Sequence, residues 1–160
     1  MGDFRVRAAG PDDRERISEL LGMSWGGAAV VAHGTVYDAL HLPALLAERD
    51  GRVVGLLTYT LSPGGLEVVT LDAVPPRGGV GSALLDAGVV VARRAGAARL
   101  WLVTTNDNLD ALRFYQRRGL RIVSVAPGAV DAARLVKPSI PETGEYGIPL
   151  HDELTLELRW

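Results

Sequence analysis

The sequence of 160 residues contains no cysteine, and only 6% of its residues are aromatic. Without a thiol, the chain forms no disulfide, no thiolate zinc site and no covalent cysteine intermediate, and we expect no metal cofactor. The longest apolar-leaning stretch, Ser82 to Ala92, is interrupted by Asp86 and Gly88 and is too short to cross a membrane. Residues 1–7 lack the apolar core of a signal peptide. These absences predict a cytoplasmic protein with no membrane partner.

An excess of positive charge is also missing, because 17 Lys and Arg residues stand against 19 Asp and Glu residues, for a formal net charge of −2. Domains that bind nucleic acid normally carry a basic patch or a basic total, so we expect no nucleic-acid partner. The composition, with 48% hydrophobic and 22% charged residues, is typical of an ordered globule. A chain of this length buries roughly 70% of its unfolded surface in one core. We therefore expect a single domain over residues 1–160.

The first part of the sequence alternates between strand and helix signals. Residues Phe4 to Ala8 alternate apolar and basic side chains, as a half-buried strand does. Turn and helix-start residues follow at 10–13, and apolar residues at helical spacing occur from Ile17 to Leu21. The glycine-rich stretch Gly22 to Gly34 predicts a loop or a broken helix with a short apolar segment inside it.

Three consecutive antiparallel strands are predicted next. The Asp50-Gly51 pair between the apolar runs of Leu45 to Leu61 is a strong hairpin signal. A further turn at Pro63–Gly65 leads into Leu66–Val74, whose β-branched residues indicate a buried strand.

A strand, glycine loop, helix and strand follow in that order. The glycines of Gly78–Gly81 open a helix that runs to about Arg94, and Arg99–Thr105 is rich in β-branched residues. Asn108 is a suitable N-cap and Gly119 a suitable C′ residue for a helix over residues 109–118. The remaining predicted strands are Leu120 to Val125 and Leu154 to Leu158.

Residues 74–82, with the sequence VPPRGGVGS, run from a strand end through glycines into a helix N-terminus. Such a junction binds phosphate, because free N–H groups point outward, the helix dipole adds positive charge and glycines let the anion approach the backbone. Arg77 can add a positive charge. The alternative is an ordinary glycine-containing loop. A P-loop is excluded because no Gly-Lys-Ser/Thr follows, and a dinucleotide fingerprint is excluded because Leu84 stands where its third glycine belongs.

The second motif is residues 106–120, NDNLDALRFYQRRGL, directly after a predicted strand. At helical spacing, Ala111, Phe114 and Tyr115 share a face, with Tyr115 one turn beyond Ala111. A tyrosine at this position can point its hydroxyl toward a cofactor. The alternative is that Phe114 and Tyr115 are core aromatics with a satisfied hydroxyl.

Together these motifs resemble those of the GNAT superfamily of N-acetyltransferases, and the order of elements from Phe4 to Val125 fits that family's fold. The resemblance implies an α/β (α+β) domain in which a mixed, mostly antiparallel twisted sheet of about six to seven strands is flanked by helices. It implies transfer of an acetyl group from acetyl-CoA to a primary amine by direct attack, with Tyr115 protonating the departing CoA thiolate. The residues implied to bind acetyl-CoA are Ala73, Val74, Arg77, Gly78, Gly79, Val80, Gly81, Ser82, Asn106, Asn108, Ala111 and Tyr115.

The reaction needs further groups beside the acid. A neutral amine attacks the thioester, and the developing oxyanion needs a donor, for which the backbone N–H groups around Asp72 to Val74 are available. Glu67 and Asp72 are candidate bases, acting directly or through water. Each acid is equally open to interpretation as a solvated charge at a strand end.

For the acceptor amine, the family resemblance implicates the segment between the first strand and the hairpin, together with the C-terminal strands. Trp25, His33 and Tyr37 are the candidate substrate-binding residues, although each also has an ordinary structural explanation. Residues 127–152 are long for a loop without structure, so we expect them to cover the acceptor site or a dimer interface. The expected partners are acyl-CoA and an amine, with a monomer or homodimer. The alternative function is a non-catalytic acyl-CoA-binding sensor or interaction module.

Overall fold

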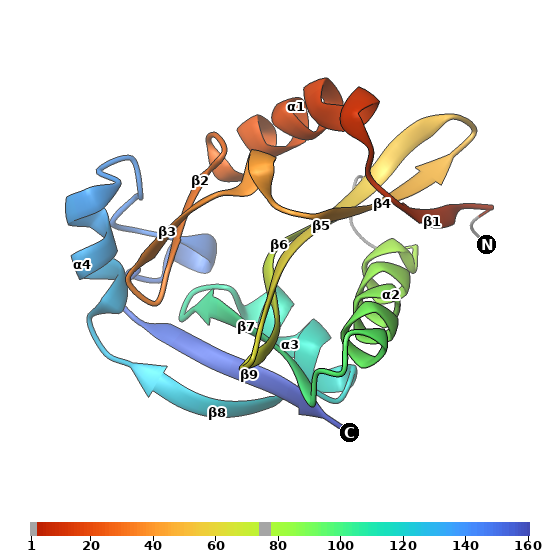
Figure 1. The fold of residues 1–160 in the computed structure, drawn as a ribbon. Coiled ribbons are helices and arrows are strands. Elements are labelled where there is room, and N and C mark those ends of the chain that lie inside the picture. The colour runs from red at the N-terminus through yellow and green to blue at the C-terminus, as the bar shows by residue number, and fades with distance from the viewer. Residues whose placement is uncertain (1–2, 74–77) are drawn as a thin grey trace. The chain divides into compact units, whose positions relative to one another are not determined.

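The computed structural model describes residues 3–73 and 78–160 (Figure 1). Val74 and Arg77 of the predicted cofactor-binding set therefore lie outside the described residues. The chain divides into two compact units. The first consists of Met1–Val30 and Tyr37–Leu100, and the second consists of Val31–Val36 and Trp101–Trp160.

The strands of the first unit are β1 (Arg5–Ala8), β4 (Ala44–Arg49), β5 (Arg52–Ser62) and β6 (Gly65–Ala73). They pair antiparallel in the order β1-β4-β5-β6. The Asp50-Gly51 turn joins β4 to β5, with both residues at positive φ. The structure therefore confirms the N-terminal strand and the three consecutive antiparallel strands predicted between Leu45 and Val74.

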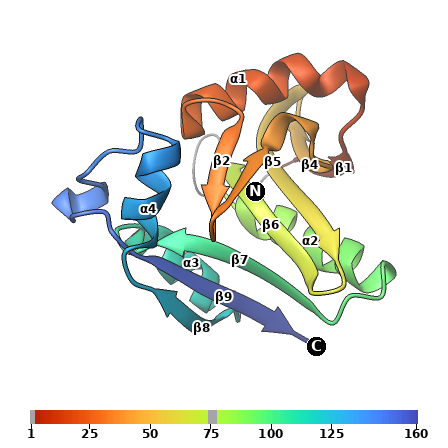
Figure 2. The same ribbon diagram turned by 60° about the vertical axis from the view of Figure 1, so that its left-hand side comes forward.

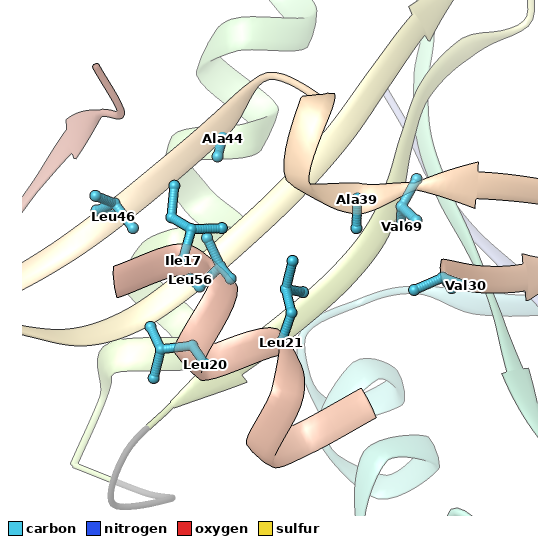
Figure 3. Packing of buried hydrophobic residues seen from close by; sticks show 9 residues of the cluster. All are labelled: Ile17, Leu20, Leu21, Val30, Ala39, Ala44, Leu46, Leu56 and Val69. Atoms are coloured by element: carbon cyan, nitrogen blue, oxygen red, sulfur yellow. The ribbon is translucent and has the colours of Figure 1, made fainter. Parts of the chain in front are cut away.

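Two helices cover opposite faces of these strands, as Figures 1 and 2 show. Helix α1 (Arg14–Trp25), which follows the short 3₁₀ turn η1 (Pro11–Asp13), buries its apolar stripe of Ile17, Leu20 and Leu21. Figure 3 shows these side chains packed with Leu46 of β4 and Leu56 of β5. Helix α2 (Val80–Arg94) lies on the other face, where Gly88 approaches Leu57 and Leu100. The helix predicted to run from the glycine loop to Arg94 is thereby confirmed.

The prediction for Gly22 to Gly34 is wrong in part. Helix α1 continues through Gly22 to Trp25 and ends at Gly26, whose φ of 73° is the left-handed cap that glycine favours. A two-stranded hairpin follows, made of β2 (Ala29–Ala32) and β3 (Thr35–Asp38), with a 3₁₀ turn η2 (Ala39–His41) after it. Its tip at His33 and Gly34 has positive φ at both residues. The hairpin was missed because its strands are only four residues long and flanked by helix-ending glycines.

The second unit contains strands β7 (Arg99–Thr105), β8 (Arg121–Ala126) and β9 (Glu153–Arg159), of which β8 and β9 pair antiparallel. Residues Arg99 and Leu100 at the start of β7 belong to the first unit. Helix α3 (Leu109–Arg117) lies between β7 and β8 in sequence. These strands and this helix confirm the elements predicted for residues 99–125 and 154–158.

Residues 127–152 are not the long loop that the sequence suggested. They contain helix α4 (Ala129–Val136) and a 3₁₀ turn η3 (Glu145–Gly147). The guanidinium of Arg134 donates hydrogen bonds to three backbone carbonyls beyond α4, those of Ile140, Pro141 and Leu150, at 2.8 to 3.1 Å. The half-buried guanidinium of Arg134 thus satisfies backbone carbonyls that lie outside the helices and strands, which orders the part of the segment after α4. Proline and glycine flanking α4 masked its helical pattern in the sequence.

The predicted fold class is confirmed, since seven strands belong to the main sheet, the pairings described above are antiparallel and helices flank the strands. That residues 1–160 act as one domain stays a prediction. Among the described helices, none is both long and apolar enough to span a membrane.

Candidate functional site

The glycine motif forms a left-handed turn directly before α2. Gly78 and Gly79 have φ values of 86° and 85°, and Gly79 is the N-cap of the helix. The N–H of Ala83 donates to the carbonyl of Gly79 at 3.0 Å. By helix geometry, the N–H groups of Val80, Gly81 and Ser82 therefore lie at the open N-terminal end. The first turn contains no acidic residue, so the positive end of the helix dipole is available to an anion.

A glycine in the neighbouring strand lets this first turn approach the sheet. Gly55 of β5 pairs with Ala73 at the end of β6. A Cβ added at Gly55 would lie 2.5 Å from Cγ1 of Val80 and 2.8 Å from Cδ1 of Leu84. Gly55 is thus the residue that allows α2 to begin where it does, and its meaning was not recognisable from the sequence because it depends on a contact with a helix 25 residues later.

Both acidic residues of β6 reach the α1 face of the sheet, and a bulge is the reason. Strict alternation from Asp72 would place Glu67 on the opposite face. The pairing with β5 shifts between Thr58 and Tyr59, so that Thr58 pairs with Thr70 but Tyr59 pairs with Val68. The extra residue in β6, Val69, returns Glu67 to the face of Asp72. A bulge commonly re-aims a side chain in this way.

Glu67 is 4% exposed and accepts a hydrogen bond of 2.6 Å from the hydroxyl of Tyr37 at Oε1. Burial, together with the carboxylate of Glu67, raises the pKa of the Tyr37 phenol above its usual value. The hydroxyls of Thr58 and Thr70, both fully buried, lie 2.6 Å apart on the same face. A buried polar row of this kind is costly unless each member is paired, and these members are paired.

Asp72 accepts a hydrogen bond of 2.8 Å from Nε1 of Trp25 at Oδ2. Burial raises the pKa of the Asp72 carboxyl, and hydrogen bonds from Trp25 and Ser24 partly oppose that shift. Trp25 is the last residue of α1, so this bond fixes the C-terminal end of the helix to β6. The structure thus pairs Trp25 with Asp72 and Tyr37 with Glu67, all within the first unit.

The other predicted residues of the second motif lie on and before α3. Asn108 is the N-cap position, as predicted, but its side chain donates to Oγ1 of Thr104 at 3.2 Å and does not cap the helix. Ala111 and Tyr115 are half-buried, one turn apart. The ring of Tyr115 meets that of Phe114 edge-on, with centroids 5.5 Å apart. These placements test none of the predicted roles, so the roles of Asn108, Ala111 and Tyr115 stay predictions.

Two predicted residues of the second unit are engaged with its C-terminal part. The backbone N–H of exposed His33 donates to Oε1 of buried Glu153 at 3.1 Å, and its ring lies 5.3 Å from that of Trp101. Asn106 uses both ends of its amide to bond the backbone of residues 149–152. Residues 149–152 belong to the segment that was expected to cover the acceptor site or a dimer interface, but no local sequence signal indicated their contacts with Asn106. Over residues 3–73 and 78–160, no cluster of three or more His, Asp or Glu side chains has the geometry to hold a metal ion.

A helix N-terminus opened by glycines, beside a strand that carries two acidic residues on one face, can bind an anion such as a phosphate group. The model of the Acetyltransferase (GNAT) family matches residues 15–120. The protein YdhI of Bacillus subtilis (strain 168) is 34% identical over 142 residues, which cover 88% of this chain and 89% of YdhI. The chain therefore belongs to the GNAT acetyltransferase family and is an acetyltransferase.

Solved structures agree on the fold. The IAA acetyltransferase from Bacillus cereus ATCC 14579 superposes with a TM-score of 0.76 over 99% of this chain and all of that one, at 21% identity. A GNAT family acetyltransferase from Elizabethkingia anophelis, with acetyl-CoA bound, superposes with a TM-score of 0.69 over 100% of both chains, at 17% identity. These similarities are structural and extend beyond the two motifs to the whole chain.

Proposed function

We propose that this protein transfers an acetyl group from acetyl-CoA to a primary amine by direct attack of the amine on the thioester. The observation that carries the proposal is the left-handed glycine turn at Gly78 and Gly79, which opens α2. In the proposal, N–H groups from Gly78 to Ser82 bind the pyrophosphate of CoA, and Arg77 adds charge. Ala73, Val74, Asn108 and Ala111 contact the remainder of the donor.

A diphosphate suits this turn better than an uncharged ligand does. Gly78 and Gly79 are exposed, and over residues 3–73 and 78–160 no atom lies within 4 Å of a Cβ added at either, so these residues leave the backbone open to a ligand. Other residues would be strained at these positive φ values, so the backbone conformation accounts for glycine at both positions. Backbone N–H donors at a helix start stabilise an anion by charge and by hydrogen bonds together.

For the base we propose Glu67 rather than Asp72. Burial raises the pKa of Asp72, and its Oδ2 is occupied by Trp25, which suits it to a structural role. Glu67 is more deeply buried and is held at one oxygen by Tyr37. In the proposal, the Glu67 carboxylate accepts a proton from the amine, directly or through an intervening water. Tyr37 then positions the base, while Trp25 and His33 contribute to acceptor binding.

Calorimetric titration with acetyl-CoA, followed by thiol release against a panel of amines, tests the proposal. We expect saturable binding, with CoA released only when an amine is present. ATP and NAD, titrated in parallel, should not bind comparably. Binding without release for any amine would favour the acyl-CoA sensor, and no binding of acetyl-CoA would overturn the proposal.

Replacing Glu67 by Gln should lower kcat/KM about a hundredfold at neutral pH, because the amide keeps an acceptor for Tyr37 but removes the base. The loss should shrink as the pH approaches the pKa of the acceptor amine, since a free amine needs no base. Tyr37→Phe, which leaves the carboxylate in place, should lower kcat/KM less than Glu67→Gln does. The measurement is kcat/KM against pH for the three proteins. A constant deficit of Glu67→Gln at every pH would contradict the assignment of the base.

A further inference from the structure

The residues just before α3 are fastened to the segment that precedes β9. Oδ1 of Asn106 accepts hydrogen bonds from the backbone N–H groups of His151 and Asp152, each at 3.0 Å. Its Nδ2 donates to the carbonyl of Pro149 at 2.8 Å. The backbone N–H of Asn106 also donates to the carbonyl of Asp152 at 3.0 Å. A side chain with both amide ends on one segment holds that segment in register with the end of β7.

Asp107 makes a second attachment. Its side chain is buried, with Oδ1 accepting from the hydroxyl of Thr105 at 2.5 Å and Oδ2 accepting from the backbone N–H of Glu145 at 2.8 Å. Gly144 packs so closely on this carboxylate that a Cβ there would overlap Oδ2. The φ of Gly144 is −102°, which other residues also adopt, so glycine is needed here for space rather than for backbone conformation.

Tyr146 makes the third attachment, on the first turn of α3. Its hydroxyl donates to Oδ1 of Asp110 at 2.6 Å. Its backbone has φ 60° and ψ 19°, a left-handed conformation that is unusual for an aromatic residue. Strain of this kind persists only where surrounding contacts fix the backbone, and it clusters at functional segments. The segment 142–152, here called the clamp, thus contacts the start of α3 and the residues before it at three positions: Asn106, Asp107 and Asp110.

We propose that the clamp positions the start of α3 for acetyl-CoA binding, with Asp107 and Gly144 as positioning residues. The inference rests on the proposed function, in which Asn108 contacts the donor. Asn108 follows Asn106 and Asp107 directly, so its backbone is fixed by both attachments. In this arrangement Asn106 holds the clamp by its hydrogen bonds, and Asn108 contacts the donor. This role differs from the cover of an acceptor site or dimer interface expected for residues 127–152.

Replacing Gly144 by Ala tests the clamp. The added methyl group must displace Asp107 or the clamp, and we expect the Kd for acetyl-CoA to rise roughly tenfold, since small displacements of positioning groups have effects of this order. Amide hydrogen exchange at Leu112, whose N–H donates to the carbonyl of Asn108 at 2.9 Å, should accelerate. Asp107→Ala should also raise the Kd for acetyl-CoA and accelerate the exchange at Leu112. Asp107→Asn should restore binding, because its amide can accept from Glu145 and donate to Thr105.

The control Glu142→Ala removes an exposed acid from the same segment. Gly22→Ala repeats the glycine change in α1, where an added Cβ meets nothing within 4 Å. Both should bind acetyl-CoA like the wild type. Far-UV circular dichroism separates a local change from unfolding, and rescue by Asp107→Asn separates positioning from general destabilisation. Unchanged binding and exchange in Gly144→Ala and Asp107→Ala would overturn the clamp. If the wild type does not bind acetyl-CoA, the proposed function is overturned. The role of the clamp in acetyl-CoA binding is then overturned as well.

Discussion

Replacement of Tyr115 by Phe should lower kcat about a thousandfold while leaving the Kd for acetyl-CoA unchanged, as expected when a general acid is removed. In the proposed reaction, the CoA thiolate leaves as the amide forms, and a phenol can donate the proton it needs. The ring remains, so its edge-on contact with Phe114 at 5.5 Å and the packing of α3 are kept. The measurement is steady-state kinetics with the best amine of the panel, together with calorimetric binding of acetyl-CoA.

Tyr59→Phe is the matched control, because it deletes the hydroxyl of another half-buried tyrosine, on β5. It should retain full turnover. If Tyr115→Phe weakens acetyl-CoA binding as much as it lowers kcat, the hydroxyl binds the donor and is not the acid. If kcat is retained, proton transfer comes from another group or from solvent, and the assignment of Tyr115 is wrong.

Local signals in the sequence account for most of the fold. The Asp50-Gly51 turn, the helix-ending Gly119 and the alternation of Leu154 to Leu158 each predict an element from neighbouring residues alone. The glycine turn before α2 was predictable for the same reason, since a helix start and its preceding glycines are adjacent in sequence.

The remaining features depend on contacts between distant residues. The bulge at Val69 depends on the pairing of β6 with β5, and it alone decides that Glu67 shares a face with Asp72. Gly144 depends on Asp107, which lies 37 residues earlier in the chain, and nothing near either residue signals the contact. Helix α4 was missed although it is local, because the prolines and glycines around it dominated the pattern.

Replacing Gly55 by Val should cost about 3 kcal/mol of unfolding free energy, because it inserts bulk into a packed contact. It should also abolish measurable binding of acetyl-CoA. The new side chain occupies the space of Val80 and Leu84, whose nearest atoms would lie 2.5 and 2.8 Å from its Cβ. Since Val80 is the first residue of α2, displacing it moves the N–H groups proposed to bind the pyrophosphate. Denaturant unfolding and calorimetric titration measure the two effects.

The smaller change Gly55→Ala separates displacement of α2 from a general loss of packing. Its Cβ meets the side chains of Val80 and Leu84 and, at 3.2 Å, the backbone carbonyl oxygen of Asp72. Because Ala adds less bulk than Val, it should cost less and weaken acetyl-CoA binding only in part. Combining Gly55→Ala with Val80→Ala removes the closest of those atoms. A double-mutant cycle should then show that the second change recovers part of the affinity lost in the first, with a favourable coupling between the two positions. Strictly additive losses would mean that Gly55 does not act through Val80, and the position of the first turn of α2 would then have another cause.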